Sequence, residues 1–151
     1  MSLITLRTID DPSGRLTAIE GDAIPFPVRR VFYITDVPAG ASRGGHAQRT
    51  MQEVIIAISG SFDVSMYDEH GPHRWQLNRP TVGLHVPANV WRSLSNFSSN
   101  SVALVLASTQ YDEADYIRDF ELFKAGLEVL EEPYFERRAK THSLEELQGV
   151  R

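Results

Sequence analysis

A short stretch of this sequence carries the side-chain types that acid–base catalysis requires. The run Arg43-Gly44-Gly45-His46-Ala47-Gln48 brings together a guanidinium, an imidazole and an amide, and Glu53 follows five residues after Gln48. The unperturbed pKa of imidazole lies close to neutrality, so His46 is the candidate general base. His46 and Gln48 are two residues apart, which places both side chains on one face of a strand. The stretch therefore predicts proton transfer on an oxygenated substrate.

A second set of candidates further along the chain consists of Pro87, Asn89, Arg92 and Asn96. Arginine stays protonated in proteins and presents its donors in a fixed fork, so Arg92 can stabilise an enediolate oxygen. We expect Glu53 to be a buried partner that holds the Arg92 guanidinium in place. Gln48 can form hydrogen bonds but cannot take up a proton, so the base must be His46.

The elements that position these residues have the pattern of short strands. Segments rich in β-branched and aromatic residues recur every 8–12 residues or so, with turn sequences between them, which is typical of a sandwich or barrel. Within Phe62–Tyr67 apolar and polar residues alternate, as in a half-buried strand. The expected strands are Leu3–Thr8, Val31–Thr35, Val54–Ser59, Phe62–Tyr67, Arg74–Leu77, Val82–Val86, Trp91–Phe97 and Val102–Ser108.

The pattern changes after Tyr111. Apolar residues at helical spacing predict a helix over Asp112–Gly126, which the glycine can end. A capping pattern predicts a final helix that begins at Ser143-Leu144-Glu145-Glu146. We expect one domain over residues 1–151, with a barrel over about residues 1–110 and a helical segment over about residues 111–151.

Composition excludes several classes of function. The net charge is −5 and the sequence supplies no dense basic surface, so we expect no nucleic-acid partner. No apolar run approaches the roughly 18 residues that suggest a transmembrane helix, and no signal peptide is evident. We therefore expect a cytoplasmic protein without a membrane partner. The absence of cysteine excludes disulfides, thiolate catalysis and zinc–sulfur sites. The pairs Arg29-Arg30 and Arg137-Arg138 are interpreted as solvated or locally salt-bridged.

The spacing of the two candidate sets resembles the two motifs of the cupin superfamily. The first motif has the form H-x-H-x(3,4)-E-x6-G and is matched from His46 to Gly60, with glutamine at the second histidine. The second has the form P-x-G-x2-H-x3-N and is matched from Pro87 to Asn96, with asparagine for glycine and Arg92 for histidine. The resemblance implies an all-β cupin or jelly-roll β-barrel with a short helical C-terminal appendage.

The departures from these motifs argue against a metal centre. Metal-binding cupins present three histidines and one glutamate, whereas only His46 and Glu53 keep ligand-type side chains here. Gln48 is a poor ligand, and the Arg92 guanidinium brings a positive charge to the place where a cation would sit. We expect neither a bound metal nor another cofactor.

A narrower resemblance covers approximately residues 30–124. It rests on Arg43–Gln48, Gly83–Pro87, Trp91–Ser98, Leu104–Ser108 and, above all, the block Tyr111–Phe120. These segments are similar to the WxcM-like family, whose characterised members include dTDP-4-keto-6-deoxyglucose 3,4-ketoisomerases. The resemblance implies a metal-free homodimer that helps to build deoxyamino sugars for bacterial surface polysaccharide. Family members typically carry a second histidine where this chain has Gln48.

The resemblance also assigns roles to individual residues. The implied enzyme moves a proton between C3 and C4 of a dTDP-linked 4-keto-6-deoxyhexose. His46 is the base, Tyr33 or a water completes the relay, and Gln48 is a helper that can only form hydrogen bonds. Arg43, whose counterpart precedes the histidine run near the ligand, contacts phosphate or sugar. The expected substrate-binding set is Arg43, Arg92, Glu53, His85 and Asn96.

Two other functions stay open on the sequence. Replacement of the second histidine is also consistent with a non-catalytic cupin that binds a sugar nucleotide, and residue 48 is the discriminating feature. A 3,5-epimerase of the same barrel type is the third reading. Its usual His–Asp pair and tyrosine acid have no matching signature in this chain.

Overall fold

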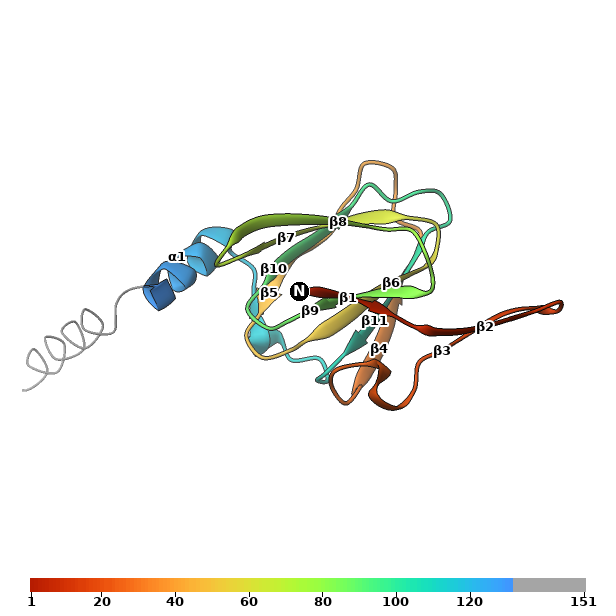
Figure 1. The fold of residues 1–151 in the computed structure, drawn as a ribbon. Coiled ribbons are helices and arrows are strands. Elements are labelled where there is room, and N and C mark those ends of the chain that lie inside the picture. Colours follow the sequence, from red (N-terminus) through yellow and green to blue (C-terminus); the bar gives the residue numbers. More distant parts are fainter. Residues whose placement is uncertain (132–151) are drawn as a thin grey trace, which may run out of the picture.

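The structure, a computed structural model, describes the backbone of residues 1–131 and the side chains up to Leu127. Most of this range forms antiparallel strands, and a helix follows at its C-terminal end, so the expected all-β barrel with a helical appendage is confirmed (Figure 1). The helix expected at Ser143–Glu146 lies outside the described residues. No helix in the described range is both long and apolar enough to span a membrane.

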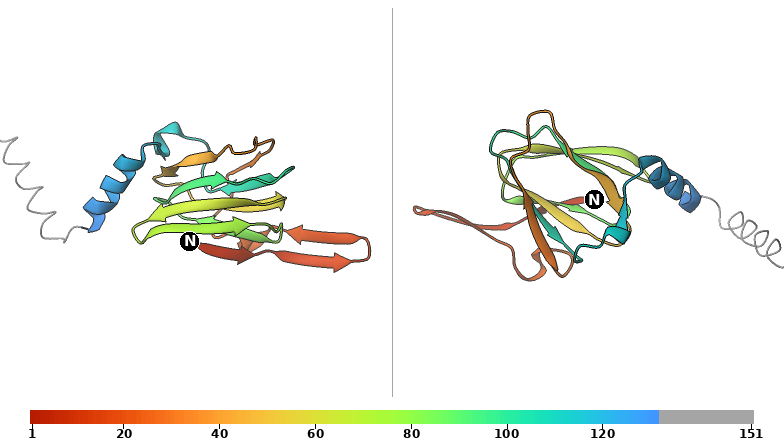
Figure 2. Two further views of the ribbon diagram at one scale, coloured as in Figure 1. Left: turned by 90° about the horizontal axis from the view of Figure 1, so that it is seen from above. Right: turned by 180° about the vertical axis from the view of Figure 1, so that it is seen from behind.

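Two five-stranded sheets face each other and enclose the core (Figures 1 and 2). The strand orders are β1-β9-β6-β11-β4 and β12-β5-β10-β7-β8, and β2 pairs with β3 in a separate hairpin. The strands are β1 (Ser2–Thr5), β2 (Arg7–Asp11), β3 (Gly14–Ala18), β4 (Arg30–Ile34), β5 (Arg43–Gln48), β6 (Glu53–Ser59), β7 (Phe62–Asp68), β8 (Gly71–Leu77), β9 (Val82–Val86), β10 (Trp91–Ser95), β11 (Val102–Ala107) and β12 (Tyr116–Ile117). The helices are the 3₁₀ turns η1 (Gly21–Ala23) and η2 (Glu113–Asp115) and the α-helix α1 (Phe120–Glu131).

The main core lies between the two sheets. Phe62, Val64 and Met66 of β7 are buried in it, as the alternation along this strand predicted. Ile55 and Ala57 of β6 face them from the first sheet. Burial of these side chains removes apolar surface from water, which is the dominant favourable term in folding.

The first sheet is covered on its outer face as well. Val54 and Ile56 of β6 pack there against Leu6 and Phe26 from the N-terminal segment. Because β6 is buried on both faces, it is apolar without interruption from Val54 to Ala57 rather than alternating.

The expected internal strands are all present, with ends that differ by up to three residues. The expected N-terminal strand Leu3–Thr8 is divided instead. Leu6 is buried in the outer cluster and its N–H donates to the carbonyl of Thr81, so β1 ends before it and β2 begins after it. The hairpin formed by β2 and β3, which was not predicted, projects from the barrel on the side opposite α1 (Figure 2).

The helix expected over Asp112–Gly126 is wrong in its first half. Asp112 accepts a hydrogen bond from the Ala114 N–H and begins the short turn η2, and the next residues pair with β5 as strand β12. The α-helix begins only at Phe120, and Gly126 lies inside it. Long-range strand pairing overrides local helical spacing here.

Candidate active site

A cavity of about 250 Å³ opens between β4 and β5, where the two sheets meet. Its polar lining includes His46 and Gln48 of β5, Glu53 of β6 and Arg92 of β10. The two cupin-like motifs therefore bring these four side chains together in one cavity. Tertiary structure brings β5 beside β10 and β6 across from them, as the motif spacing implied.

A β-bulge directs His46 into this cavity. Arg92 lies opposite His46 and Ser93 lies opposite Gly44, so Gly45 is the extra residue on β5. Gly44 and Gly45 have φ angles of +80° and +76°, a backbone conformation that favours glycine. A Cβ atom on Gly44 would lie 3.1 Å from the Arg92 carbonyl oxygen. Gly44 thus permits the close approach of β5 to β10, and the bulge places His46 opposite Arg92.

His46 is partly buried and its Nδ1 atom has no hydrogen-bond partner within the described chain. Burial, followed by the nearby Arg92 guanidinium, lowers the pKa of His46 from 6.5 to about 4. The imidazole is therefore neutral at physiological pH. A neutral imidazole can accept a proton, which is what a general base requires.

Arg92 and Glu53 form a buried ion pair below His46. Arg92 Nε lies 2.7 Å from Glu53 Oε1, and the side chains are 2% and 6% exposed. The expected pairing of these residues is therefore present. Arg92 Nη2 is buried without a hydrogen-bond partner among the described residues. It is an available donor in a low-dielectric site, where such a donor is most effective.

Gln48 is 1% exposed and lies deeper than His46. Its Nε2 atom is 3.3 Å from Met51 Sδ, a weak acceptor, and Oε1 has no partner among the described residues. Arg43 lies at the exposed end of β5 and borders the same cavity. Gln48 and Arg43 therefore both line the cavity that contains His46.

Tyr33 borders the cavity, but its side chain lies on the outer face of the first sheet. Phe32 and Ile34, its neighbours on β4, pack against the core, whereas Tyr33 pairs with Leu104 of the outer cluster and is 69% exposed. Its predicted part in the proton relay does not fit this position.

Two further predicted residues lie outside the cavity. His85 is opposite Val54 on the outer face of the sheet, and its Nε2 atom is 3.0 Å from Gln52 Oε1. Asn96 donates from Nδ2 to Asp63 Oδ2 over 3.1 Å and adopts a φ of +53° just after β10. In this arrangement Asn96 stabilises a turn, and neither residue reaches the candidate base.

Two lining residues were missed as site residues. Arg30, interpreted as solvated or salt-bridged, has its guanidinium 4.4 Å from the centroid of Phe32, and its Nη1 atom is buried without a partner among the described residues. Tyr116 packs its ring against His46 at 4.9 Å between centroids. Arg30 could have been found from the sequence, because it lies two residues before Phe32 on β4, which points inward. Tyr116 could not, because its helical spacing predicted a helix where the structure has strand β12.

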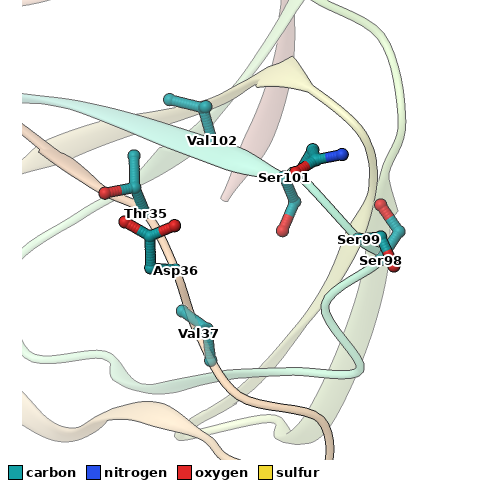
Figure 3. Close-up of a pocket in the computed structure, with 8 residues that line it drawn as sticks. Thr35, Asp36, Val37, Ser98, Ser99, Ser101 and Val102 are labelled. Atoms are coloured by element: carbon teal, nitrogen blue, oxygen red, sulfur yellow. The ribbon is translucent and has the colours of Figure 1, made fainter.

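A second cavity, of about 330 Å³, lies where the segments after β4 and β10 meet (Figure 3). It is lined by Thr35, Asp36, Val37 and residues 98–102. Hydroxyl groups and one carboxylate dominate its polar lining, and no imidazole or guanidinium borders it. This cavity lacks the base and the cation that the first one combines.

The family described as FdtA, WxcM-like, C-terminal, matches residues 1–128. The TDP-4-oxo-6-deoxy-α-D-glucose-3,4-oxoisomerase of Aneurinibacillus thermoaerophilus is 41% identical over 123 residues, which are 81% of this chain and 88% of that protein. The chain belongs to the WxcM-like family.

Solved structures of 3,4-ketoisomerases share the WxcM-like fold of this chain. QdtA from Thermoanaerobacterium thermosaccharolyticum, in complex with TDP, gives a TM-score of 0.81 at 38% identity, covering 84% of this chain and 93% of that one. A mutant of QdtA was crystallised with TDP-4-keto-6-deoxyglucose. WlaRB, a TDP-quinovose 3,4-ketoisomerase from Campylobacter jejuni, gives 0.77 at 41% identity, covering 81% and 95%.

The lowered pKa of His46 predicts an unusual pH dependence. The neutral base is present above about pH 4, so the acid limb of kcat/KM should fall below pH 5 rather than near 6.5. Because the unfolded chain binds this proton at a higher pH, His46 should also lower stability as pH falls from 6.5 through 4. The check is kcat/KM from pH 4 to 8, with tryptophan fluorescence to confirm folding. An acid limb centred at 6.5 would contradict the prediction.

Proposed function

We propose that this protein is a sugar-nucleotide 3,4-ketoisomerase that acts on a dTDP-linked 4-keto-6-deoxyhexose. The observation that carries the proposal is a neutral imidazole, His46, placed opposite the buried guanidinium of Arg92 in one cavity. The oxoisomerase and ketoisomerase relatives support the reaction type, and the QdtA complexes support the nucleotide and the keto sugar.

The proposed reaction needs no external oxidant. The C3–H of a 4-keto sugar is acidic, and His46 removes that proton to form a C3=C4 enediolate whose negative charge lies on O4. Arg92 Nη2 is the donor available to stabilise this oxygen. The O3 hydroxyl proton is then transferred to O4, His46 returns its proton to C4, and C3 becomes the carbonyl. Atoms and electrons balance because the substrate and product are isomers.

Gln48 does not take up a proton in this scheme. Its Oε1 atom, which has no partner in residues 1–127, accepts a hydrogen bond from a substrate hydroxyl or a bound water.

Arg30 is assigned to the anionic part of the substrate together with Arg43. Arg30 has a buried nitrogen without a hydrogen-bond partner among the described residues, and it lines the cavity from β4, as Arg43 does from β5. No carboxylate in the described part of the chain pairs with Arg30, so its guanidinium is suited to bind phosphate oxygens in a bidentate manner.

This assignment predicts the effect of removing the Arg30 charge. Arg30→Gln should weaken TDP binding about tenfold or more, because a hydrogen bond to a charged group contributes roughly 1.5–3 kcal/mol. Arg29→Gln is the matched control, since Arg29 is exposed on the neighbouring position and surface substitutions usually change little. Isothermal titration with TDP and with thymidine separates the phosphate contribution. Equal losses for both ligands, or none with TDP, would contradict the assignment.

The function itself is tested in deuterated water. The protein is incubated with dTDP-4-keto-6-deoxyglucose, and NMR follows deuterium entry at C3 and formation of the 3-keto product. Exchange followed by product formation supports the proposal. Tight binding of TDP with neither exchange nor product, for dTDP- and UDP-linked 4-keto sugars, would instead support a non-catalytic binding protein. This second candidate is considered because Gln48 stands where family members typically carry a second histidine.

The proposal includes a reaction without metal or other cofactor. In the described part of the chain, no group of three or more His, Cys, Asp or Glu side chains is arranged to hold a metal ion. The supporting chemistry is that Arg92 fills the place of a ligand with a permanent positive charge. We further propose a cytoplasmic enzyme that supplies deoxyamino sugars for bacterial surface polysaccharide.

We also propose that the protein is a homodimer. Strand β1 is an edge of the first sheet, and exposed edges require cover. Ile9 and Leu16 lie opposite each other on the projecting hairpin, and they are 47% and 58% exposed. Sedimentation equilibrium at micromolar concentration should give about twice the chain mass of 17.0 kDa. A mass equal to one chain would count against the N-terminal segment as an interface.

A further inference from the structure

The Tyr111–Arg118 block forms an arm that is fastened to the turn between β5 and β6. The Asp115 carboxylate accepts hydrogen bonds from the Thr50 N–H at 2.8 Å, the Thr50 hydroxyl at 2.8 Å and the Met51 N–H at 3.1 Å. A carboxylate that accepts several hydrogen bonds makes a strong, directional anchor. The anchor therefore joins the arm to the residues directly after Gln48.

Arg49, which lies in the same turn as Thr50, also holds the arm. Its backbone N–H donates to the Asp115 carbonyl at 2.9 Å, and its guanidinium donates to the carbonyls of Ala114 and Tyr116 at 3.0 and 3.1 Å. Beyond these contacts, Tyr116 pairs with Gln48 in strand β12. The backbone position of Tyr116 is thus determined by several independent bonds.

This anchoring places the Tyr116 ring directly against the candidate base. The Tyr116 and His46 ring centroids are 4.9 Å apart, with an interplanar angle of 63°. Edge-to-face packing of this kind is a favourable aromatic geometry. Tyr116 also lines the cavity itself, so it forms one wall of the space beside the imidazole.

The Tyr116 ring is supported in turn by a cation. The Arg118 guanidinium lies 4.5 Å from the ring centroid and donates to Glu113 from Nε at 2.8 Å and Nη2 at 2.9 Å. Hydrogen bonding from Arg118, then from Tyr111, lowers the pKa of Glu113 to about 2, so this pair is charged at neutral pH. The bidentate contact fixes the plane that stacks on the tyrosine.

The imidazole needs such a wall because, among the described residues, only a backbone contact at Gly44 offers it a hydrogen bond. A catalytic histidine is usually oriented by a partner on its second ring nitrogen, yet His46 Nδ1 has no partner among the described residues. Packing against Tyr116 is the contact that can take over this task. Displacement of a reacting group by about 1 Å can cost about 100-fold in rate.

We propose that Tyr116 is a positioning residue for His46, and that the Asp115 anchor holds it in place. The catalytic consequence rests on the proposed function, whereas the placement of the imidazole can be tested without it. The aromatic ring carries this role, and the hydroxyl group does not take part in the reaction.

The test compares Tyr116→Phe, which keeps the ring, with Tyr116→Leu, which removes it. NMR follows the His46 imidazole signals, identified by their loss in His46→Asn, in otherwise unchanged protein. Tyr116→Phe should keep the ring-current-shifted His46 signals and kcat within about twofold. Tyr116→Leu should shift those signals and lower kcat about 10–100-fold with little change in TDP affinity. Asp115→Ala, which keeps the ring but removes its anchor, should shift the same signals partway towards those of the leucine variant.

Several outcomes would overturn the inference. Unchanged His46 signals and kcat in Tyr116→Leu would show that the ring does not position the base. Equal losses of kcat in the phenylalanine and leucine variants would make the hydroxyl a reacting group instead. If the leucine variant fails to fold, nuclear Overhauser contacts between His46 and Tyr116 in the unmodified protein decide, and their absence refutes the placement. A wild type without isomerase activity would refute the function while the NMR results still decide the positioning.

Discussion

His46→Asn is expected to lower turnover at least about 100-fold while TDP binding is retained. General-base catalysis typically contributes about 10²–10⁴-fold, and asparagine keeps a hydrogen-bonding group of similar reach but cannot hold a proton near pH 7. His46 is the imidazole of the cavity, and its neutral form dominates above about pH 4. The substitution therefore removes the proton acceptor and keeps most of the hydrogen-bonding contacts.

The decisive measurement separates C3 proton exchange from product formation. Both rates should fall together in His46→Asn, because the same abstraction step precedes each. Exchange at the wild-type rate would place the base elsewhere. Tyr33 and His85 lie on the outer face of the sheet, so Tyr116, which packs against the imidazole, would be the next candidate.

Gln48 supplies the internal comparison for this result. Gln48→Ala should cost less than His46→Asn, because it removes a positioning hydrogen bond rather than the proton acceptor. Gln48→His restores the second histidine that family members typically carry, and should preserve or raise activity by adding a second titrating group. A larger loss in Gln48→Ala than in His46→Asn would reverse the assigned roles.

The second large effect is expected on stability. Arg92→Met should lower the free energy of unfolding by about 3–5 kcal/mol, because it leaves the Glu53 carboxylate buried without its charged partner. Arg92 and Glu53 are almost fully buried and 2.7 Å apart. Activity should also be lost, since the donor for the enediolate is removed.

A double variant distinguishes the two losses. Glu53→Met combined with Arg92→Met should recover most of the stability, because an apolar pair of similar volume often replaces a buried ion pair without cost, but it should stay inactive. Urea unfolding monitored by tryptophan fluorescence gives the free energies. Arg15→Met, in the exposed pair with Asp10, is the control and should leave the midpoint nearly unchanged. Equal destabilisation by the single and double variants would contradict this account.

The sequence by itself determined the barrel and the centre of the site. Strand periodicity and turn residues are local signals, so seven internal strands could be placed to within three residues, whereas β5, which carries His46, was expected as a strand without bounds. Motif spacing identified His46, Gln48, Glu53 and Arg92, because residues on neighbouring strands of a known barrel keep a fixed relation along the chain. The pairing of Glu53 with Arg92 followed from the cost of burying a lone charge.

Tertiary structure decided which face each side chain occupies. The outer face of the first sheet also carries apolar residues, so apolar neighbours could not reveal that Tyr33 and His85 point outward. The position of the Tyr111–Arg118 arm could likewise not be predicted from the sequence alone. Its helical spacing is real, but Asp115 and Arg49 form hydrogen bonds across more than sixty positions of sequence and hold Tyr116 in a strand. Contacts at that separation outweigh local propensity, and only the folded chain brings them together.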